Sequence, residues 1–316
     1  MTPGSAGPAV PLKSLSPRLG LGSLAFTLAD PGAAHAVLDQ WMTLGGKLLD
    51  TAAVYGAGEA ESVIGGWLRA SGARRDVILL TKGGHPDAEF RSRLDPGSIA
   101  ADLAASLERL GVDTVDVYLL HRDDQSIPVG ELIDALNEHV AAGRIRSIGA
   151  SNWTPGRVDA ANEYAAARGL AGFESVSNYF GLATRIRSLW PGTLSSTGRD
   201  ARAWHARTGM PLIAWSAQSQ GWFGDSFDPA GRGKDAFYTY DSPQNVSRRE
   251  RAFELAKRRG CSAAQLALAW VLNQPIEPIA LVGARTPGEL PTTVAAAQIV
   301  LTPDELSWLE IGGPEE

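Results

Sequence analysis

Three apolar stretches of this sequence end in a residue that can carry charge or transfer a proton. KLLD ends at Asp50, VILLTK at Lys82 and VDVYLLH at His121. A buried strand is expected to stay apolar until it leaves the core, so a titratable residue at its end is expected at the mouth of the fold. Each residue alone has an ordinary structural explanation. Three of them at consecutive ends indicate a reaction centre.

Tyr55 follows Asp50 by five positions, in a segment that enters the next helix. A free phenol has a pKa near 10, too high for efficient proton transfer at neutral pH. A lysine beside it favours the phenolate, so Lys82 is expected to pull this pKa down. Asp50 would hold the lysine and balance its charge, and His121 would hydrogen-bond a substrate oxygen. The set predicts proton transfer to an oxygen-bearing substrate.

The elements that must position these residues alternate regularly along the chain. Eight short runs rich in Val, Ile and Leu predict buried parallel strands, at residues 18–26, 47–52, 77–82, 115–121, 145–151, 173–179, 211–217 and 278–284. Helical apolar spacing between them predicts helices, among them 33–44, 59–70, 96–110, 129–142 and 155–168. This alternation predicts an α/β chain with a single-domain (β/α)₈ TIM barrel.

Local signals support these boundaries and mark two interruptions. Asp95 before Pro96 is typical of a helix start, and Gly111, Gly143 and Gly169 stand where helices end. Residues 180–197 and 218–246 are expected to be irregular. Long loops after barrel strands commonly carry substrate specificity.

Composition narrows the functional classes. The 316 residues contain 29 Lys and Arg against 35 Asp and Glu, a net charge of -6 that argues against nucleic-acid binding. The single cysteine, Cys261, excludes an intrachain disulfide. Residues 1–14, rich in Pro, Gly and Ala, are expected to be flexible, with the barrel over 15–316. With no secretory signal and no membrane-length apolar stretch, we expect a soluble cytoplasmic protein, a monomer or a homo-oligomer, without a membrane partner.

Four segments together resemble the aldo-keto reductase superfamily: DTAAVYG at 50–56, TKGG at 81–84, LLHRDD at 119–124 and SNW at 151–153. The resemblance runs from about Leu19 to Trp308. It implies reduction of aldehydes or ketones to alcohols, with hydride from a nicotinamide cofactor held without a Rossmann fold. It makes Tyr55 the proton donor and Lys82 the group that lowers its pKa. Asp50 then becomes the counter-ion, and His121 the group that orients the substrate.

The resemblance also implies a set of cofactor-binding positions. They are Gly22, Ser23, Leu24, Ser151, Asn152, Asn178, Trp215, Ser216, Ala217, Gln218, Ser219, Gly221, Gly283, Ala284, Arg285, Glu289 and Thr293. Trp215 is the position expected to stack on the nicotinamide. Most relatives prefer NADPH, and Arg285 suits a 2′-phosphate, whereas Glu289 would repel one and favour NADH. NADPH is therefore the expected cofactor, with NADH as the alternative.

Phe26, Trp153, Trp222 and Phe223 are expected to line the substrate pocket, which suggests an apolar or aromatic carbonyl. Two other functions remain open. A barrel lyase or isomerase would use Lys82 as a Schiff-base amine, and a regulatory or interaction subunit of the same fold would turn over little. A metal enzyme is not expected, because the five histidines are dispersed and form no metal-binding pair.

Overall fold

The computed structural model describes residues 10, 12–225, 227–231 and 233–313. Eight strands lie within them: β1 (Leu19–Gly22), β2 (Leu48–Asp50), β3 (Ile78–Gly83), β4 (Val115–Leu120), β5 (Ile145–Ser151), β6 (Phe173–Ser177), β7 (Ile213–Ala214) and β8 (Ile279–Val282). They form one sheet in the order β6-β5-β4-β3-β2-β1-β8-β7, and the neighbouring strands with a described register run parallel. Eight such strands alternating with helices make a (β/α)₈ fold, as predicted.

The described helices carry the chain from strand to strand. They are α1 (Pro31–Thr43), α2 (Glu59–Ser71), α3 (Pro96–Leu110), α4 (Val129–Ala141), α5 (Pro155–Arg168), α6 (Arg199–Thr208), α7 (Lys234–Tyr240), α8 (Pro243–Arg259), α9 (Ala263–Leu272), α10 (Leu290–Ala295) and α11 (Pro303–Ile311). Among the described residues, no helix is long and apolar enough to cross a membrane.

Contacts divide the chain into two compact units. Among the described residues, unit 1 comprises 10, 12–15, 20–177 and 283–288, and unit 2 comprises 16–19, 178–225, 227–231, 233–282 and 289–313. Most of the expected flexible segment 1–14 lies outside the described residues, and Leu12–Ser14 form a 3₁₀ turn with Leu12 buried. The single domain over 15–316 stays a prediction.

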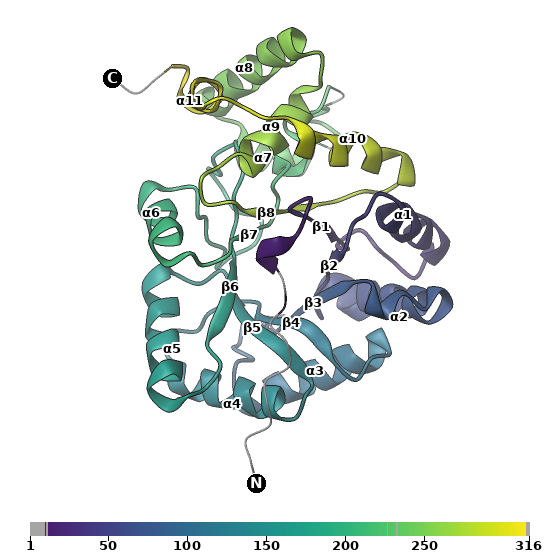
Figure 1. The fold of residues 1–316 in the computed structure, drawn as a ribbon, viewed down its shortest axis with the longest axis vertical. Coiled ribbons are helices and arrows are strands. Elements are labelled where there is room, and N and C mark those ends of the chain that lie inside the picture. The colour runs from purple at the N-terminus through teal and green to yellow at the C-terminus, as the bar shows by residue number, and fades with distance from the viewer. Residues whose placement is uncertain (1–9, 11, 226, 232, 314–316) are drawn as a thin grey trace. The chain divides into compact units, whose positions relative to one another are not determined.

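In unit 1, helices α2 to α5 follow one another around strands β2 to β6 (Figure 1). Every residue of β2 and β4 is buried, which explains why these strands read as continuous apolar runs. The predicted helix signals are confirmed. The Asp95 carboxylate accepts a hydrogen bond from the Ser98 amide at 2.9 Å, and Gly111 and Gly169 close α3 and α5 at φ 66° and 65°.

In unit 2 the sequence-based boundaries need correction. Strand β7 has two residues rather than the predicted 211–217, and β6 ends at Ser177. Residues 180–197 contain no helix or strand, as expected. The prediction that 218–246 is an irregular loop is wrong, because α7 and the start of α8 lie inside this segment. The buried Tyr240 ring anchors α7, and Ser242 caps α8 ahead of Pro243.

Candidate active site

Three strand ends of unit 1 bring the predicted residues together. Asp50 is the last residue of β2, Lys82 is the penultimate residue of β3, and His121 directly follows β4. The strands pair in parallel, so their carboxyl ends meet at one edge. Asp50 and Lys82 are each 2% exposed and His121 is 7% exposed. Parallel register, rather than closeness in sequence, makes them neighbours.

The Lys82 ammonium makes three hydrogen bonds. Its Nζ donates to Asp50 Oδ1 at 2.6 Å, to the Thr51 carbonyl oxygen at 2.9 Å and to the Tyr55 hydroxyl at 3.2 Å. An ammonium has three protons, so all of its donors are used. The lysine is therefore fixed between an acidic side chain and a phenol.

Tyr55 is positioned by a loop tied to the strands beneath it. Its amide donates to the Ala52 carbonyl at 3.0 Å, and the Ala53 amide donates to the carbonyl of Lys82 at 3.0 Å. The next two residues, Gly56 and Ala57, are left-handed at φ 56° and 53°, which turns the chain into α2. The half-buried phenol thus meets Lys82 because its loop is pinned to the strand that carries the lysine.

The charges of this cluster set its protonation. Burial works to lower the pKa of Lys82, but the charges of Asp50 and Tyr55 outweigh burial, and the pKa is raised. Burial raises the pKa of Tyr55 above its ordinary value, and Lys82 offsets only part of that rise. Lys82 does lower this pKa, as expected, but burial outweighs it, so the expected net lowering of the Tyr55 pKa is wrong. Near neutral pH the cluster holds an ammonium beside a protonated phenol.

His121 completes the group. Its ring lies edge-on to the Tyr55 ring, with centroids 6.0 Å apart. Burial, followed by the positive charges of Lys82 and Arg122, holds its pKa well below the ordinary value. Its Nδ1 is buried and has no hydrogen-bond partner among the described residues. A bare lone pair costs less there than an unpaired N–H, so the neutral ring is expected to carry its proton on Nε2.

One buried residue that supports this cluster, Glu61, had no role in the sequence-based prediction. Glu61, on α2, is fully buried and accepts from the Thr81 hydroxyl at 2.5 Å and from Arg109 Nε at 2.7 Å. Thr81 directly precedes Lys82, so these bonds fix the strand that carries the lysine. The signal was an acidic residue on the apolar face of a predicted helix.

Five expected cofactor positions lie at strand ends of unit 1. Ser151 Oγ donates to the Ser177 carbonyl at 2.9 Å, and Asn152 Nδ2 donates to Ser151 Oγ at 3.0 Å. The buried Ser23 hydroxyl has no partner in the described chain, whereas Leu24 is 59% exposed. Gly22 pairs with Asp50 in the sheet.

Unit 2 contains what we call the aromatic cluster, in which Arg185 lies over two rings and a third ring packs against one of them. Its members are Tyr179, Arg185, Trp190 and Trp215. The guanidinium carbon lies 5.0 Å from the Tyr179 ring centroid and 4.9 Å from that of Trp215. Trp190 meets Trp215 edge-on at 6.2 Å. Arg185 NH1 also donates to Thr193 Oγ1 at 2.8 Å. Sequence reasoning missed Arg185, because it stands in the irregular segment 180–197.

The backbone around Trp215 turns sharply. Ser216, Ser219 and Gln220 have φ values of 52°, 48° and 53°, which non-glycine residues seldom adopt. Asn178 is buried, and its Nδ2 donates to Ser196 Oγ at 3.2 Å. The other expected positions in this stretch are Ala217, buried, Gln218, half-buried, and Gly221, exposed.

The expected adenosine-binding positions are mostly on the surface. Arg285, Gly283 and Glu289 are exposed, whereas Ala284 is buried. After Thr286 the chain forms a 3₁₀ turn, Pro287–Glu289, followed by the short α10. Thr293 Oγ1 donates to the Glu289 carbonyl at 3.0 Å.

The four expected pocket walls are packed inside the protein. Phe26, Trp153, Trp222 and Phe223 are between 0% and 4% exposed. Trp153 donates from Nε1 to the Arg122 carbonyl at 3.0 Å and meets Phe173 edge-on at 5.1 Å. Burial in the core is therefore enough to explain why large apolar residues stand at these four positions.

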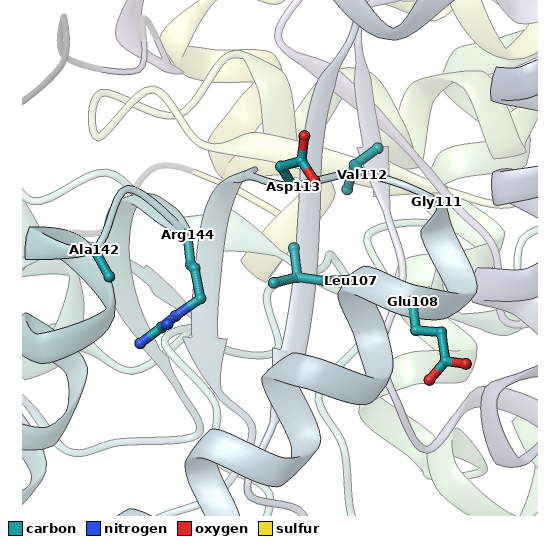
Figure 2. Close-up of a pocket in the computed structure, with 7 residues that line it drawn as sticks. All are labelled: Leu107, Glu108, Gly111, Val112, Asp113, Ala142 and Arg144. Carbon is teal, nitrogen blue, oxygen red and sulfur yellow. The ribbon is translucent and has the colours of Figure 1, made fainter.

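A surface hollow of about 600 Å³ lies elsewhere in unit 1, between Leu107, Val112 and Arg144 (Figure 2). It sits where the chain enters β4 and β5, at the amino ends of strands whose carboxyl ends carry the site. In the part of the chain that the structure describes, no group of three or more His, Cys, Asp or Glu could hold a metal ion.

A model of the aldo/keto reductase family matches residues 18–311. The chain is a member of the aldo/keto reductase family. This is the family that the strand-end motifs predicted, and the match spans strands β1 to β8.

Relatives in the family are named as oxidoreductases. The uncharacterized oxidoreductase YrpG of Bacillus subtilis (strain 168) is 28% identical over 305 residues, covering 92% of this chain and 90% of that protein. Versiconal hemiacetal acetate reductase of Aspergillus parasiticus is 31% identical over 293 residues, covering 83% and 81%. An aldo-keto reductase from Klebsiella pneumoniae, solved in complex with NADPH, matches with a TM-score of 0.72 and 26% identity, covering 95% and 92%.

Proposed function

We propose that this protein reduces aldehydes or ketones to alcohols with NADPH or NADH, and that Tyr55 donates the proton. The observation that carries the proposal is the hydrogen-bonded series Asp50–Lys82–Tyr55, in which the buried Lys82 donates to both partners. Membership of the family and the NADPH-bound neighbour support a nicotinamide cofactor.

The residues present fit such a cofactor. The buried Ser23 hydroxyl and Trp215 Nε1 have no hydrogen-bond partner among the described residues, so each has capacity for a ligand. We expect Ser151, Asn152 and Asn178 to hold the carboxamide, Trp215 to contact the ring, and the 216–221 backbone to hold phosphate. When bound, the nicotinamide supplies the hydride.

Tyr55 provides the proton for the carbonyl oxygen as negative charge develops there. Its raised pKa keeps the phenol protonated at neutral pH but makes it a weaker acid, so the proposed transfer depends on Lys82, which lowers that pKa and stabilises the phenolate as the proton leaves. Loss of the proton leaves a phenolate 3.2 Å from the Lys82 ammonium, which stabilises it. Asp50 keeps that ammonium charged and in place.

His121 orients the substrate. A neutral ring with its proton on Nε2 donates one hydrogen bond to the carbonyl oxygen, and it does not compete with Tyr55 as an acid. Its depressed pKa keeps it in this form across neutral pH.

The same geometry disfavours the Schiff-base alternative. A nucleophilic lysine must lose its proton, whereas the pKa of Lys82 is raised by the charges of Asp50 and Tyr55, which outweigh the effect of burial. Lys82 therefore acts as a fixed cation.

For the cofactor we favour NADPH, in line with the bound cofactor of the Klebsiella pneumoniae protein. Arg285 is the cation expected near a 2′-phosphate, and the exposed Glu289 works against it. For the substrate we favour an apolar or aromatic carbonyl, as the residue types of Phe26, Trp153, Trp222 and Phe223 suggested.

The test is oxidation of NADPH or NADH in the presence of nitrobenzaldehyde. Tyr55→Phe should lower turnover about 10²- to 10⁴-fold, the usual contribution of a general acid. Cofactor binding, measured by fluorescence titration, should be nearly unchanged. Tyr164→Phe is the matched control, because the hydroxyl of this α5 tyrosine donates to Asp134 at 2.8 Å on the surface, away from the candidate site. Near-normal turnover of Tyr55→Phe would show that another group donates the proton.

A further inference from the structure

His85 stands at the turn after β3 and has no role in the proposed reaction. The turn depends on two glycines. A Cβ on Gly83 would lie 1.9 Å from the Tyr118 hydroxyl, and one on Gly84 would lie 2.5 Å from Leu94 Cδ2. Gly84 is left-handed at φ 68°, and its amide donates to Asp102 Oδ2 at 2.9 Å. TKGG is thus the sequence that allows the chain to turn here.

This turn places His85 against the candidate active site. Its ring meets the His121 ring edge-on, with centroids 5.1 Å apart and planes at 73°. His121 in turn meets Tyr55 at 6.0 Å. All three rings belong to unit 1 and follow β2, β3 and β4. A substrate oxygen that reaches Tyr55 and His121 therefore has His85 next to it.

The hydrogen bonding of His85 settles which of its nitrogens donates. Nδ1 lies 2.9 Å from the Pro86 carbonyl oxygen. A carbonyl oxygen only accepts, so Nδ1 carries a proton. Burial, and then the charge of Arg122, lower the pKa of His85, against the raising effects of the Pro86 hydrogen bond and Asp102. In the neutral ring Nε2 is a bare acceptor, and it has no hydrogen-bond partner among the described residues.

The two histidines thus differ in polarity. His121 presents a donor, for which a carbonyl oxygen is the partner, whereas His85 presents an acceptor, for which a hydroxyl is the partner. The geometry points to α-hydroxy aldehydes and α-hydroxy ketones as the preferred substrates, with the hydroxyl donating to Nε2 of His85. This inference rests on the proposed function, because it extends the same carbonyl site by one carbon.

The alternative is that His85 only packs against His121, and a matched pair of substrates separates the two. 2-Hydroxyacetophenone and propiophenone have the same number of heavy atoms and differ by a hydroxyl in place of a methyl group. The measurement is the ratio of their kcat/KM values in the wild type, in His85→Phe and in His85→Gln. Phenylalanine keeps the ring edge and removes the acceptor, whereas glutamine keeps an acceptor. A general loss of activity cancels in the ratio.

We expect the ratio to fall about 3- to 10-fold in His85→Phe, the size of one net hydrogen bond, and to recover in part in His85→Gln. Circular dichroism checks that each variant is folded, and His85→Leu, which also lacks an acceptor, replaces the phenylalanine variant if that variant is not folded. An unchanged ratio in a folded, active variant that lacks the acceptor would overturn the role of His85 and leave the reductase proposal standing. A wild type that reduces no carbonyl compound would overturn both.

Discussion

The strand ends of unit 1 and the aromatic cluster of unit 2 both hold a partly or fully buried cation, but by different means. Lys82 is bonded to a carboxylate, a carbonyl and a phenol. Arg185 has no carboxylate partner among the described residues, lies on the rings of Tyr179 and Trp215, and has its pKa lowered by burial. The first arrangement fixes a charge beside the proposed proton donor. The second fixes the orientation of a flat ring, at a cost in desolvation.

The largest effect should come from breaking the buried ion pair. Asp50→Asn leaves the Lys82 charge without a counter-charge, which should lower the free energy of unfolding by about 3–5 kcal/mol. Urea titration measures it. The control is Asp87→Asn, which opens the exposed pair with Arg91 and should cost less than about 1 kcal/mol. Equal losses in the two variants would mean that the Lys82 pair is not ionised.

The pH profile tests the same region. We expect kcat/KM to be flat from about pH 6.5 to about pH 10, because the pKa of His121 is depressed and that of Tyr55 is raised. Above the pKa of Tyr55 the rate should fall about tenfold per pH unit. Stability should follow, since groups with raised folded pKa values, here Tyr55 and Lys82, lose their contribution as pH rises through those values. A rise or fall of kcat/KM near neutral pH would contradict the proposed protonation states of His121 and Tyr55.

In the aromatic cluster, Arg185→Met should weaken cofactor binding about 2- to 30-fold, the range of a cation–π contact, with a smaller effect on kcat. Quenching of tryptophan fluorescence on titration with NADPH measures it. Arg187→Met is the control, because Arg187 lies over the exposed ring of Tyr238 instead. If both variants bind alike, Arg185 does not position Trp215.

The smallest effect is expected at the adenosine end. Glu289→Gln should raise the affinity for NADPH relative to NADH about 2- to 5-fold, the size of one exposed charge interaction. Paired titrations with the two cofactors give the ratio, and Asp304→Asn, exposed at the start of α11, controls for net charge. A ratio that moves equally in both variants would reflect net charge alone.

Sequence patterns predicted most of unit 1 and less of unit 2. Helices α3 and α5 begin and end at the predicted residues, because Asp95, Thr154 and their closing glycines act locally. Helix α7 was missed, because its seven residues are held by the burial of Tyr240 rather than by a local signal. Strand β7 was overestimated, since a run of apolar residues does not show where pairing stops.

By itself, the sequence determined the residue types near the ends of β2, β3 and β4, and with them the proposed chemistry, because a titratable residue stands out where an apolar run ends. Only the tertiary structure decided what surrounds those groups. It showed that burial outweighs Lys82 in raising the pKa of Tyr55, that Glu61 supports β3, and that His85 meets His121. These contacts depend on residues that the fold brings together across many positions, and desolvation depends on every atom around a group.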